Sequence, residues 1–201
     1  KVGLPDLEGA VQDVDAILSY FQLEEVILVG HSWGGNPLQE YTYRHPDRVL
    51  ALVMVDSWGQ HRYLSDKERN RIKYSSLMYK TIPWKLIADK NSKMCTDNPI
   101  TRELVKTAII ETGRDVFLNL GITGFLAVHE IEGYHGNPPM LLVRGENDFP
   151  KYLKMIYDGI MVLNPNARQV TISDSKHQPM NDHPEEFNQI IGEFFEEVVG
   201  P

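Results

Sequence analysis

The chain has 201 residues and a formal net charge of −8 at pH 7. Its apolar fraction of 42% and charged fraction of 24% are typical of globular proteins and argue against a disordered chain. The acidic balance argues against nucleic acid as a partner, because like charges would repel the phosphates.

The N-terminal part of the chain alternates between helical and strand patterns. Apolar residues recur at helical spacing over residues 5–21, which predicts an amphipathic helix. Residues 26–29 are apolar on both faces, as in a buried parallel strand. A second helix is predicted at about 34–44, and a second buried strand at 49–55.

Residues 57–135 have a different character, because buried-strand runs disappear and charged residues, aromatics and helical spacing replace them. Helices are predicted near 65–79, 101–112 and 114–132. This stretch is too long for a single crossover helix. We therefore interpret 57–135 as a helical lid inserted between two strands of a core.

The last part of the chain returns to alternating strands and helices, which predicts a parallel sheet with right-handed crossovers. The expected fold is α/β, a mostly parallel sheet with flanking helices, whose partial core comprises residues 1–56 and 136–201. The predicted strands of this part lie at 140–143 and 168–172, and its helices near 150–162 and 184–199.

A G-x-S-x-G pentapeptide, Gly30-His31-Ser32-Trp33-Gly34, joins the first strand to the second helix. This pattern is typical of a sharp strand-to-helix turn that holds the serine in a strained conformation and exposes its Oγ. The alternative is a glycine-rich turn without chemistry. Because a buried strand leads into the motif and a helix follows it, we interpret Ser32 as a nucleophile.

A serine nucleophile needs a general base, which an acid in turn orients. Asp148 follows the third predicted strand and His177 follows the fourth, so both should lie at the same edge of the sheet as Ser32. In the fold that carries this kind of turn, the chain order is Ser, then Asp or Glu, then His, and this chain has that order. Asp148 as a loop cap and His177 as a surface residue are the alternatives.

Several segments resemble the cap-bearing α/β-hydrolase superfamily, most closely its esterase and carbon–carbon-bond hydrolase branch. They are Val-Gly-His-Ser-Trp-Gly-Gly (29–35), Arg-His-Pro-Asp-Arg-Val (44–49), Gly-Glu-Asn-Asp (145–148), and His177 followed by Pro184, Glu185 and Phe187. One departure is Lys176, where the family usually has glycine. Some relatives place the acid after the second strand of this chain, so the resemblance makes Asp56 an alternative to Asp148.

The oxyanion and substrate contacts follow from the same reasoning. The backbone N–H of Trp33, at a helix N-terminus, should face a developing oxyanion. Trp58 is expected in an apolar substrate pocket. His31 is expected to pack inside the turn, whereas His61, His129 and His135 fall in or beside the lid. The other lid side chains that could line the pocket are Tyr63, Tyr74, Met78, Tyr79, Trp84, Phe117 and Phe125.

The resemblance also implies a gap before Ser32. The family has further strands there, and a loop among them, often marked by His-Gly, supplies the second oxyanion donor. We therefore expect the N-terminal strands of the fold to be absent from this chain. The strand at 26–29 would then be an edge, open to association with a second copy or a missing N-terminal segment. Loss of one oxyanion donor typically slows acyl transfer by about 10²- to 10³-fold.

Features of the chain that concern location are few. Cys95 is the only cysteine, which fits a reducing compartment. No apolar run approaches the roughly 18 residues of a membrane span, and no signal peptide is visible at the start. We expect a cytoplasmic protein that does not bind a membrane.

The sequence thus predicts a serine hydrolase that cleaves an ester, thioester or activated carbon–carbon bond of a small apolar molecule through an acyl-enzyme on Ser32. No metal or cofactor is expected, because no His, Cys and carboxylate cluster has metal-ligand spacing. Three alternatives stay open: a non-catalytic ligand-binding or receptor protein, an inactive fragment of a longer enzyme, and a transferase or haloperoxidase-like activity at the same residues. An Asp nucleophile, as in epoxide hydrolases, is disfavoured by Ser32.

Overall fold

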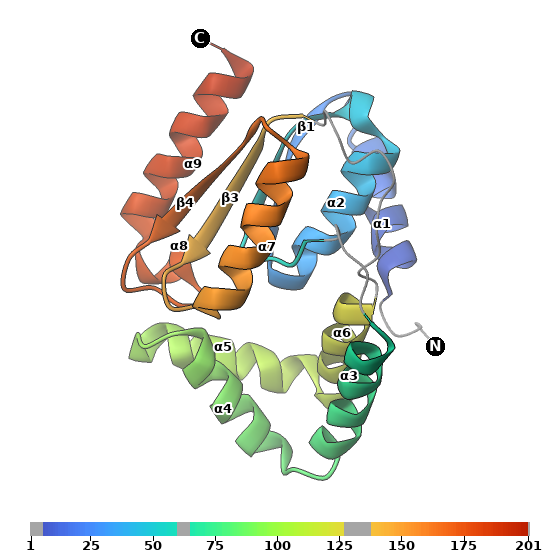
Figure 1. Cartoon of the computed structure of the whole chain (residues 1–201), viewed down its shortest axis with the longest axis vertical. Helices are drawn as coiled ribbons and strands as arrows, with labels where there is room; N and C mark the ends of the chain where they lie inside the picture. The colour runs from blue at the N-terminus through green and yellow to red at the C-terminus, as the bar shows by residue number, and fades with distance from the viewer. Residues whose placement is uncertain (1–5, 60–64, 127–137, 201) are drawn as a thin grey trace.

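A computed structural model describes residues 6–59, 65–126 and 138–200. Four parallel strands form one sheet in the order β1-β2-β3-β4 (Figure 1). The strands alternate with helices along the chain, as the sequence predicts. The strands are β1 (Val26–His31), β2 (Val49–Val55), β3 (Met140–Gly145) and β4 (Ala167–Ile172).

Helices cover both faces of the sheet because the central strands are apolar on both sides. In β2, Leu52 and Met54 face one cluster and Val53 and Val55 face the other, all essentially without exposed surface. The first cluster packs on α1 (Leu7–Tyr20), α2 (Gly35–Arg44) and α7 (Pro150–Leu163), and the second on α9 (Pro184–Val199). Parallel strands that are buried on both faces read as continuous apolar runs.

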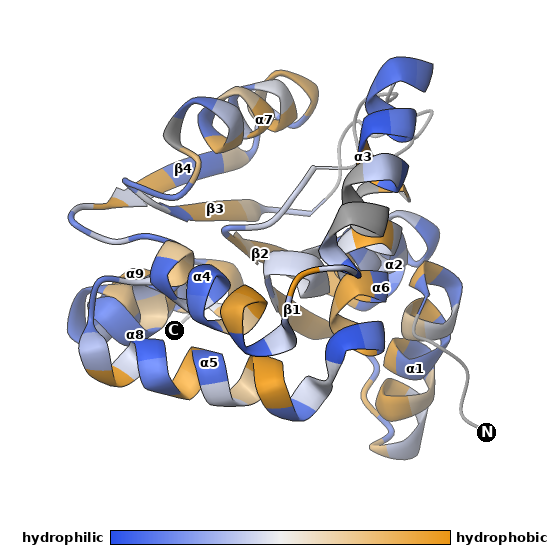
Figure 2. Cartoon of the chain, turned by 90° about the horizontal axis from the view of Figure 1, so that it is seen from below, coloured by the Kyte–Doolittle hydropathy of each residue, from blue (hydrophilic) through white to orange (hydrophobic). Residues whose placement is uncertain are grey.

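The segment between β2 and β3 is helical and lies across one end of the sheet layer (Figure 1). Seen from that side, α5 alternates hydrophilic and hydrophobic residues along its surface (Figure 2), as an amphipathic helix does. Residues 60–64 and 127–135 of the predicted lid lie outside the described residues, and the lid interpretation stays a prediction. The four helices are α3 (Asp66–Tyr79), α4 (Trp84–Cys95), α5 (Pro99–Thr112) and α6 (Arg114–Leu126).

Some observed elements differ from the predicted ones. Helix α4 is not among the predicted helices; its buried residues are Ile87, Ala88 and Ser92. Strand β1 continues through Gly30 to His31, and β3 extends to Gly145. The first helix begins at Leu7 behind the N-cap Asp6, whose carboxylate accepts the Gly9 N–H at 2.7 Å.

Strand β1 has one neighbour, β2, among the described residues, so it lies at an edge of the sheet as expected. Within the described residues, no helix is long and apolar enough to span a membrane. The remaining short elements are the 3-10 helices η1 (Ser32–Gly34) and η2 (Pro46–Arg48) and the four-residue helix α8 (Pro179–Asp182).

Candidate active site

The turn between β1 and α2 holds Ser32 in a left-handed conformation, with φ at +53°. This conformation is costly for a non-glycine residue and persists only where surrounding contacts enforce it. Gly30 and Gly35 are such contacts, since a Cβ on Gly30 would lie 2.6 Å from the Gly35 Cα. Ser57, just after β2, donates its hydroxyl to the Ser32 carbonyl at 2.7 Å. The local sequence therefore forms the strained turn that the motif predicts.

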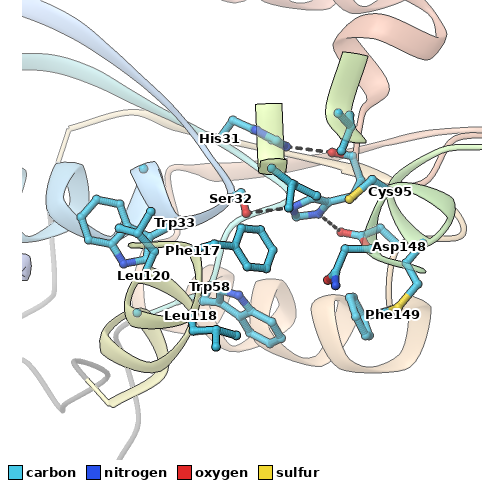
Figure 3. A pocket seen from close by; sticks show the side chains of 18 of the residues that line it. His31, Ser32, Trp33, Trp58, Cys95, Phe117, Leu118, Leu120, Asp148 and Phe149 are labelled. Carbon is cyan, nitrogen blue, oxygen red and sulfur yellow. Dashed lines mark hydrogen bonds and ion pairs between the residues drawn. The ribbon is translucent and has the colours of Figure 1, made fainter. Parts of the chain in front are cut away.

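Ser32, His177 and Asp148 come together in one hydrogen-bonded row (Figure 3). The Ser32 Oγ lies 2.7 Å from Nε2 of His177, and Asp148 Oδ2 lies 2.7 Å from its Nδ1. Asp148 is only 2% exposed, and the His177 side chain is 19% exposed. The two ring nitrogens of His177 thus face a hydroxyl on one side and a buried carboxylate on the other.

Main-chain hydrogen bonds between the loops after β3 and β4 bring Asp148 and His177 together. The Asn147 N–H donates to the Ser175 carbonyl at 2.8 Å, and the Glu146 N–H donates to the Ile172 carbonyl at 2.9 Å. Gly145 permits this approach, because a Cβ there would collide with the Lys176 carbonyl. The loops are therefore close-packed at the position where the acid and the base meet.

Lys176 occupies the position where the resemblance leads one to expect glycine. Its Nζ forms an ion pair with Asp97 at 2.7 Å, in the turn between α4 and α5. The lysine thus links the loop that carries His177 to the helical segment, and the His177 ring still contacts Ser32.

His31 does more than pack inside the turn. Its Nε2–H donates to the His177 carbonyl at 2.8 Å, and the two rings lie 4.9 Å apart. Burial, together with the charge that His177 can carry, lowers the pKa of His31 to about 4. A neutral His31 therefore holds the backbone of His177 from the side of the nucleophile.

Asp56, the alternative acid, lies next to Asp148 at the end of β2. It is buried, and its carboxylate oxygens accept the Gly145 N–H at 3.0 and 3.3 Å. Asp56, Asp148 and His177 offer ligand atoms within 4.8 Å of one another, but His177 Nδ1 already contacts Asp148. Asp148 is therefore the carboxyl group that contacts the His177 ring.

An apolar pocket of about 550 Å³ opens over Ser32 (Figure 3). Trp58 lines it, as do Trp33, Tyr79 and Phe117. Tyr74 is 71% exposed, and Trp84 packs on Phe117 with ring centroids 5.6 Å apart. The aliphatic lining and Phe149 were not predicted, because they meet only in the folded chain. The predictions for His61, Tyr63, His129 and His135, and for the side chains of Met78 and Phe125, lie outside the described residues.

We expect Gly124→Ala to impair the pocket. Gly124 is buried in α6, and a Cβ there would lie 2.5 Å from Cδ1 and 3.0 Å from Nε1 of the Trp33 ring. The Trp33 ring must then shift. The shift should raise the KM for substrate. It should also lower the midpoint temperature of unfolding by several degrees, as expected for about 1–3 kcal/mol of overpacking. Steady-state kinetics and thermal unfolding of the variant would measure both.

Gly121→Ala is the matched control for this substitution. Gly121 lies in the same helix, and a Cβ there meets nothing within 4 Å. Alanine should stabilise the helix at that position by up to about 1 kcal/mol. Equal effects of the two variants on KM would contradict the proposed contact with Trp33.

Comparisons with known proteins fit this geometry. The model of the alpha/beta hydrolase fold family matches residues 7–184. The chain is 25% identical over 220 residues to 1-acylglycerol-3-phosphate O-acyltransferase ABHD5 of Rattus norvegicus, covering 91% of this chain and 60% of that protein. It therefore spans about three-fifths of the length of this relative.

Solved structures show the same fold at low sequence identity. A thermophilic esterase from Thermogutta terrifontis superposes with a TM-score of 0.80 at 18% identity, covering 98% of this chain and 74% of that one. A meta-cleavage product hydrolase from Pseudomonas fluorescens IP01 gives 0.73 at 15% identity, covering 96% and 73%. These likenesses concern the fold alone.

Proposed function

The chain belongs to the α/β-hydrolase family, and we propose that it carries the active site of a serine hydrolase with Ser32 as nucleophile. One observation carries the proposal. The Ser32 Oγ lies 2.7 Å from Nε2 of His177, and Asp148 Oδ2 lies 2.7 Å from Nδ1 of the same ring. A hydroxyl within hydrogen-bond reach of a base, itself oriented by a buried acid, is the geometry that nucleophilic catalysis needs.

In the proposed reaction, the Ser32 Oγ attacks the carbonyl carbon of the substrate while its proton passes to Nε2 of His177. Asp148 holds Nδ1–H and stabilises the imidazolium that forms. The protonated His177 then gives its proton to the leaving group, and an acyl-enzyme remains on Ser32. Water then attacks the acyl carbon while His177 takes a proton from it, and His177 passes that proton to the Ser32 Oγ as the bond from Oγ to the acyl carbon breaks and the acid leaves. We assign one oxyanion contact, the backbone N–H of Trp33.

The pocket supports a small, uncharged, apolar acyl group as the substrate portion nearest Ser32. Among the described residues that line it, none is lysine or arginine, and most are aliphatic or aromatic. A substrate carboxylate buried there would face the acidic Asp148 without a cationic partner. Esters, thioesters and activated carbon–carbon bonds that carry such acyl groups are the proposed substrates.

The test compares two aryl esters that differ in one group. The p-nitrophenyl ester of butyric acid should be hydrolysed with a kcat/KM at least about tenfold higher than the mono-p-nitrophenyl ester of succinic acid, because the second carries a carboxylate into the apolar pocket. Stopped-flow detection of the nitrophenolate measures both rates after the release without enzyme is subtracted, because the succinate carboxylate also attacks its own ester. A preference for the succinate ester would contradict the proposed pocket chemistry.

A fluorophosphonate probe separates the enzyme from a non-catalytic binding protein of the same fold. The probe should label the folded chain covalently, and prior incubation with the butyrate ester should slow the labelling. A folded full-length protein that takes up no probe would contradict the hydrolase proposal.

Acyl transfer is the second candidate, because the matched relative from Rattus norvegicus is named as an O-acyltransferase. It differs from hydrolysis only in what attacks the acyl-enzyme. Product analysis with glycerol or a monoacylglycerol as competing acceptor, next to water, would measure the partition between the two.

A further inference from the structure

Asp56 is a buried acidic group that the proposed mechanism does not use. It is 1% exposed and sits at the carboxyl end of β2 with φ at +43°, a conformation that costs energy for a non-glycine residue. Its oxygens accept the Gly145 N–H, at the end of the neighbouring strand β3. This backbone conformation and the hydrogen bond from Gly145 hold the Asp56 carboxyl next to Asp148.

The carboxyl groups of Asp56 and Asp148 lie so close together that ionising both of them would cost much free energy. Ligand atoms of Asp56, Asp148 and His177 lie within 4.8 Å of one another, and both acids are buried. Two like charges at such a distance in a buried site favour a state in which one carboxyl keeps its proton. A carboxyl that keeps its proton can donate its O–H to the neighbouring carboxylate, which an ionised carboxyl cannot do.

The groups around Asp56 indicate that Asp56, and not Asp148, is the carboxyl group that keeps its proton. Burial, then the charge of Asp148, raises the pKa of Asp56 to about 9, and the Gly145 N–H and the charge of Arg144 oppose the shift only in part. Tyr157 of α7 also faces it, and burial raises the pKa of Tyr157, so its hydroxyl stays neutral and brings no charge to Asp56. Asp148, by contrast, contacts His177 Nδ1, which calls for an ionised acceptor.

We propose that Asp56 is a positioning residue: a neutral carboxylic acid that accepts the Gly145 N–H and donates its own O–H to Asp148, holding that carboxylate against His177. The proposal rests on the proposed function of Ser32, His177 and Asp148. It assigns Asp56 no contact with substrate and no proton transfer. Asp56 acts by fixing the Asp148 carboxylate, as outer hydrogen-bond partners fix other functional groups.

Two substitutions of Asp56, by asparagine and by alanine, test whether its hydrogen bonds position Asp148. Asp56→Asn keeps a carbonyl to accept and an N–H to donate, and asparagine tolerates a positive φ. Asp56→Ala removes both groups. On butyrate-ester hydrolysis at pH 7, we expect alanine to lower kcat by about 10- to 100-fold with KM little changed, and asparagine to recover most of that loss.

The pH profile gives a readout that a merely structural role would not move. In the wild type, kcat should fall as the pH rises, with a midpoint near pH 9, where Asp56 ionises beside Asp148. In Asp56→Asn this alkaline loss should be absent, while circular dichroism shows both proteins folded across the range. An alkaline limb that is the same in both proteins would overturn the proposal.

An infrared difference spectrum tests the protonation state without relying on activity. At pH 7, wild type minus Asp56→Asn should show the C=O stretch of a protonated carboxylic acid. Its absence would overturn the proposal even if alanine at position 56 prevents folding. If the band is present but the wild type neither hydrolyses esters nor takes up the fluorophosphonate, the hydrolase proposal fails and the protonated pair stands.

Discussion

Replacing Ser32 by alanine is expected to lower kcat for ester hydrolysis by about 10⁴- to 10⁶-fold and to abolish labelling by a fluorophosphonate. The Oγ is the atom that the proposed mechanism bonds to the acyl group, and no other described hydroxyl contacts His177 Nε2. Loss of a nucleophile in a serine–histidine–acid set removes the covalent route and leaves only binding and oxyanion contacts.

The fold should survive this substitution, so that the loss can be attributed to chemistry. Ser57 bonds the Ser32 carbonyl, not its side chain, and alanine keeps that contact. The free energy of unfolding should therefore change by no more than about 1 kcal/mol. Ser19→Ala, at an exposed position of α1, is the control and should react like the wild type. A Ser32→Ala protein that still labels would show that another residue is the nucleophile.

The elements that the sequence predicts well are those whose local pattern already fixes their geometry. The G-x-S-x-G segment requires a tight strand-to-helix turn, and Ser32 has the left-handed φ that such a turn imposes. Strand β2 is apolar at every position, and it is buried on both faces. Because parallel strands end at one edge, the positions of Asp148 and His177 directly after strands predict that both lie at the edge of the sheet where Ser32 lies.

The contacts that the sequence could not predict join segments far apart in the chain. His31 and the His177 carbonyl are 146 residues apart in sequence, and nothing near either one indicates their hydrogen bond. The link from Lys176 to Asp97 depends likewise on how the helices lie over the sheet.

The roles of Asp56 and Asp148 are a clear case that the sequence pattern does not separate. From the sequence it is an acid after a strand, equivalent to Asp148, and the resemblance leaves both open. In the structure the two carboxyls are neighbours with different partners: the Gly145 N–H for Asp56 and the His177 ring for Asp148. The environment, not the residue type, separates their proposed roles.

Replacing Asp148 by asparagine is therefore expected to lower kcat by about 10³- to 10⁴-fold at pH 7. An amide at this position can donate to Nδ1 and so favours the tautomer with the proton on Nε2, which cannot accept the proton of Ser32. The side-chain shape is kept, so KM for the butyrate ester should change little. Steady-state kinetics and thermal unfolding distinguish this loss from misfolding.

Glu146→Gln is the matched control, because Glu146 lies in the same loop, is exposed, and its side chain accepts the Asp174 N–H, a hydrogen bond that glutamine can also accept. It should leave kcat close to that of the wild type. The comparison with Asp56→Asn then decides which carboxylate orients the base. If Asp148 is the acid, its asparagine variant is nearly inactive and that of Asp56 is not. The reverse result would assign the role to Asp56 and would require His177 to turn away from the carboxylate that it contacts at 2.7 Å.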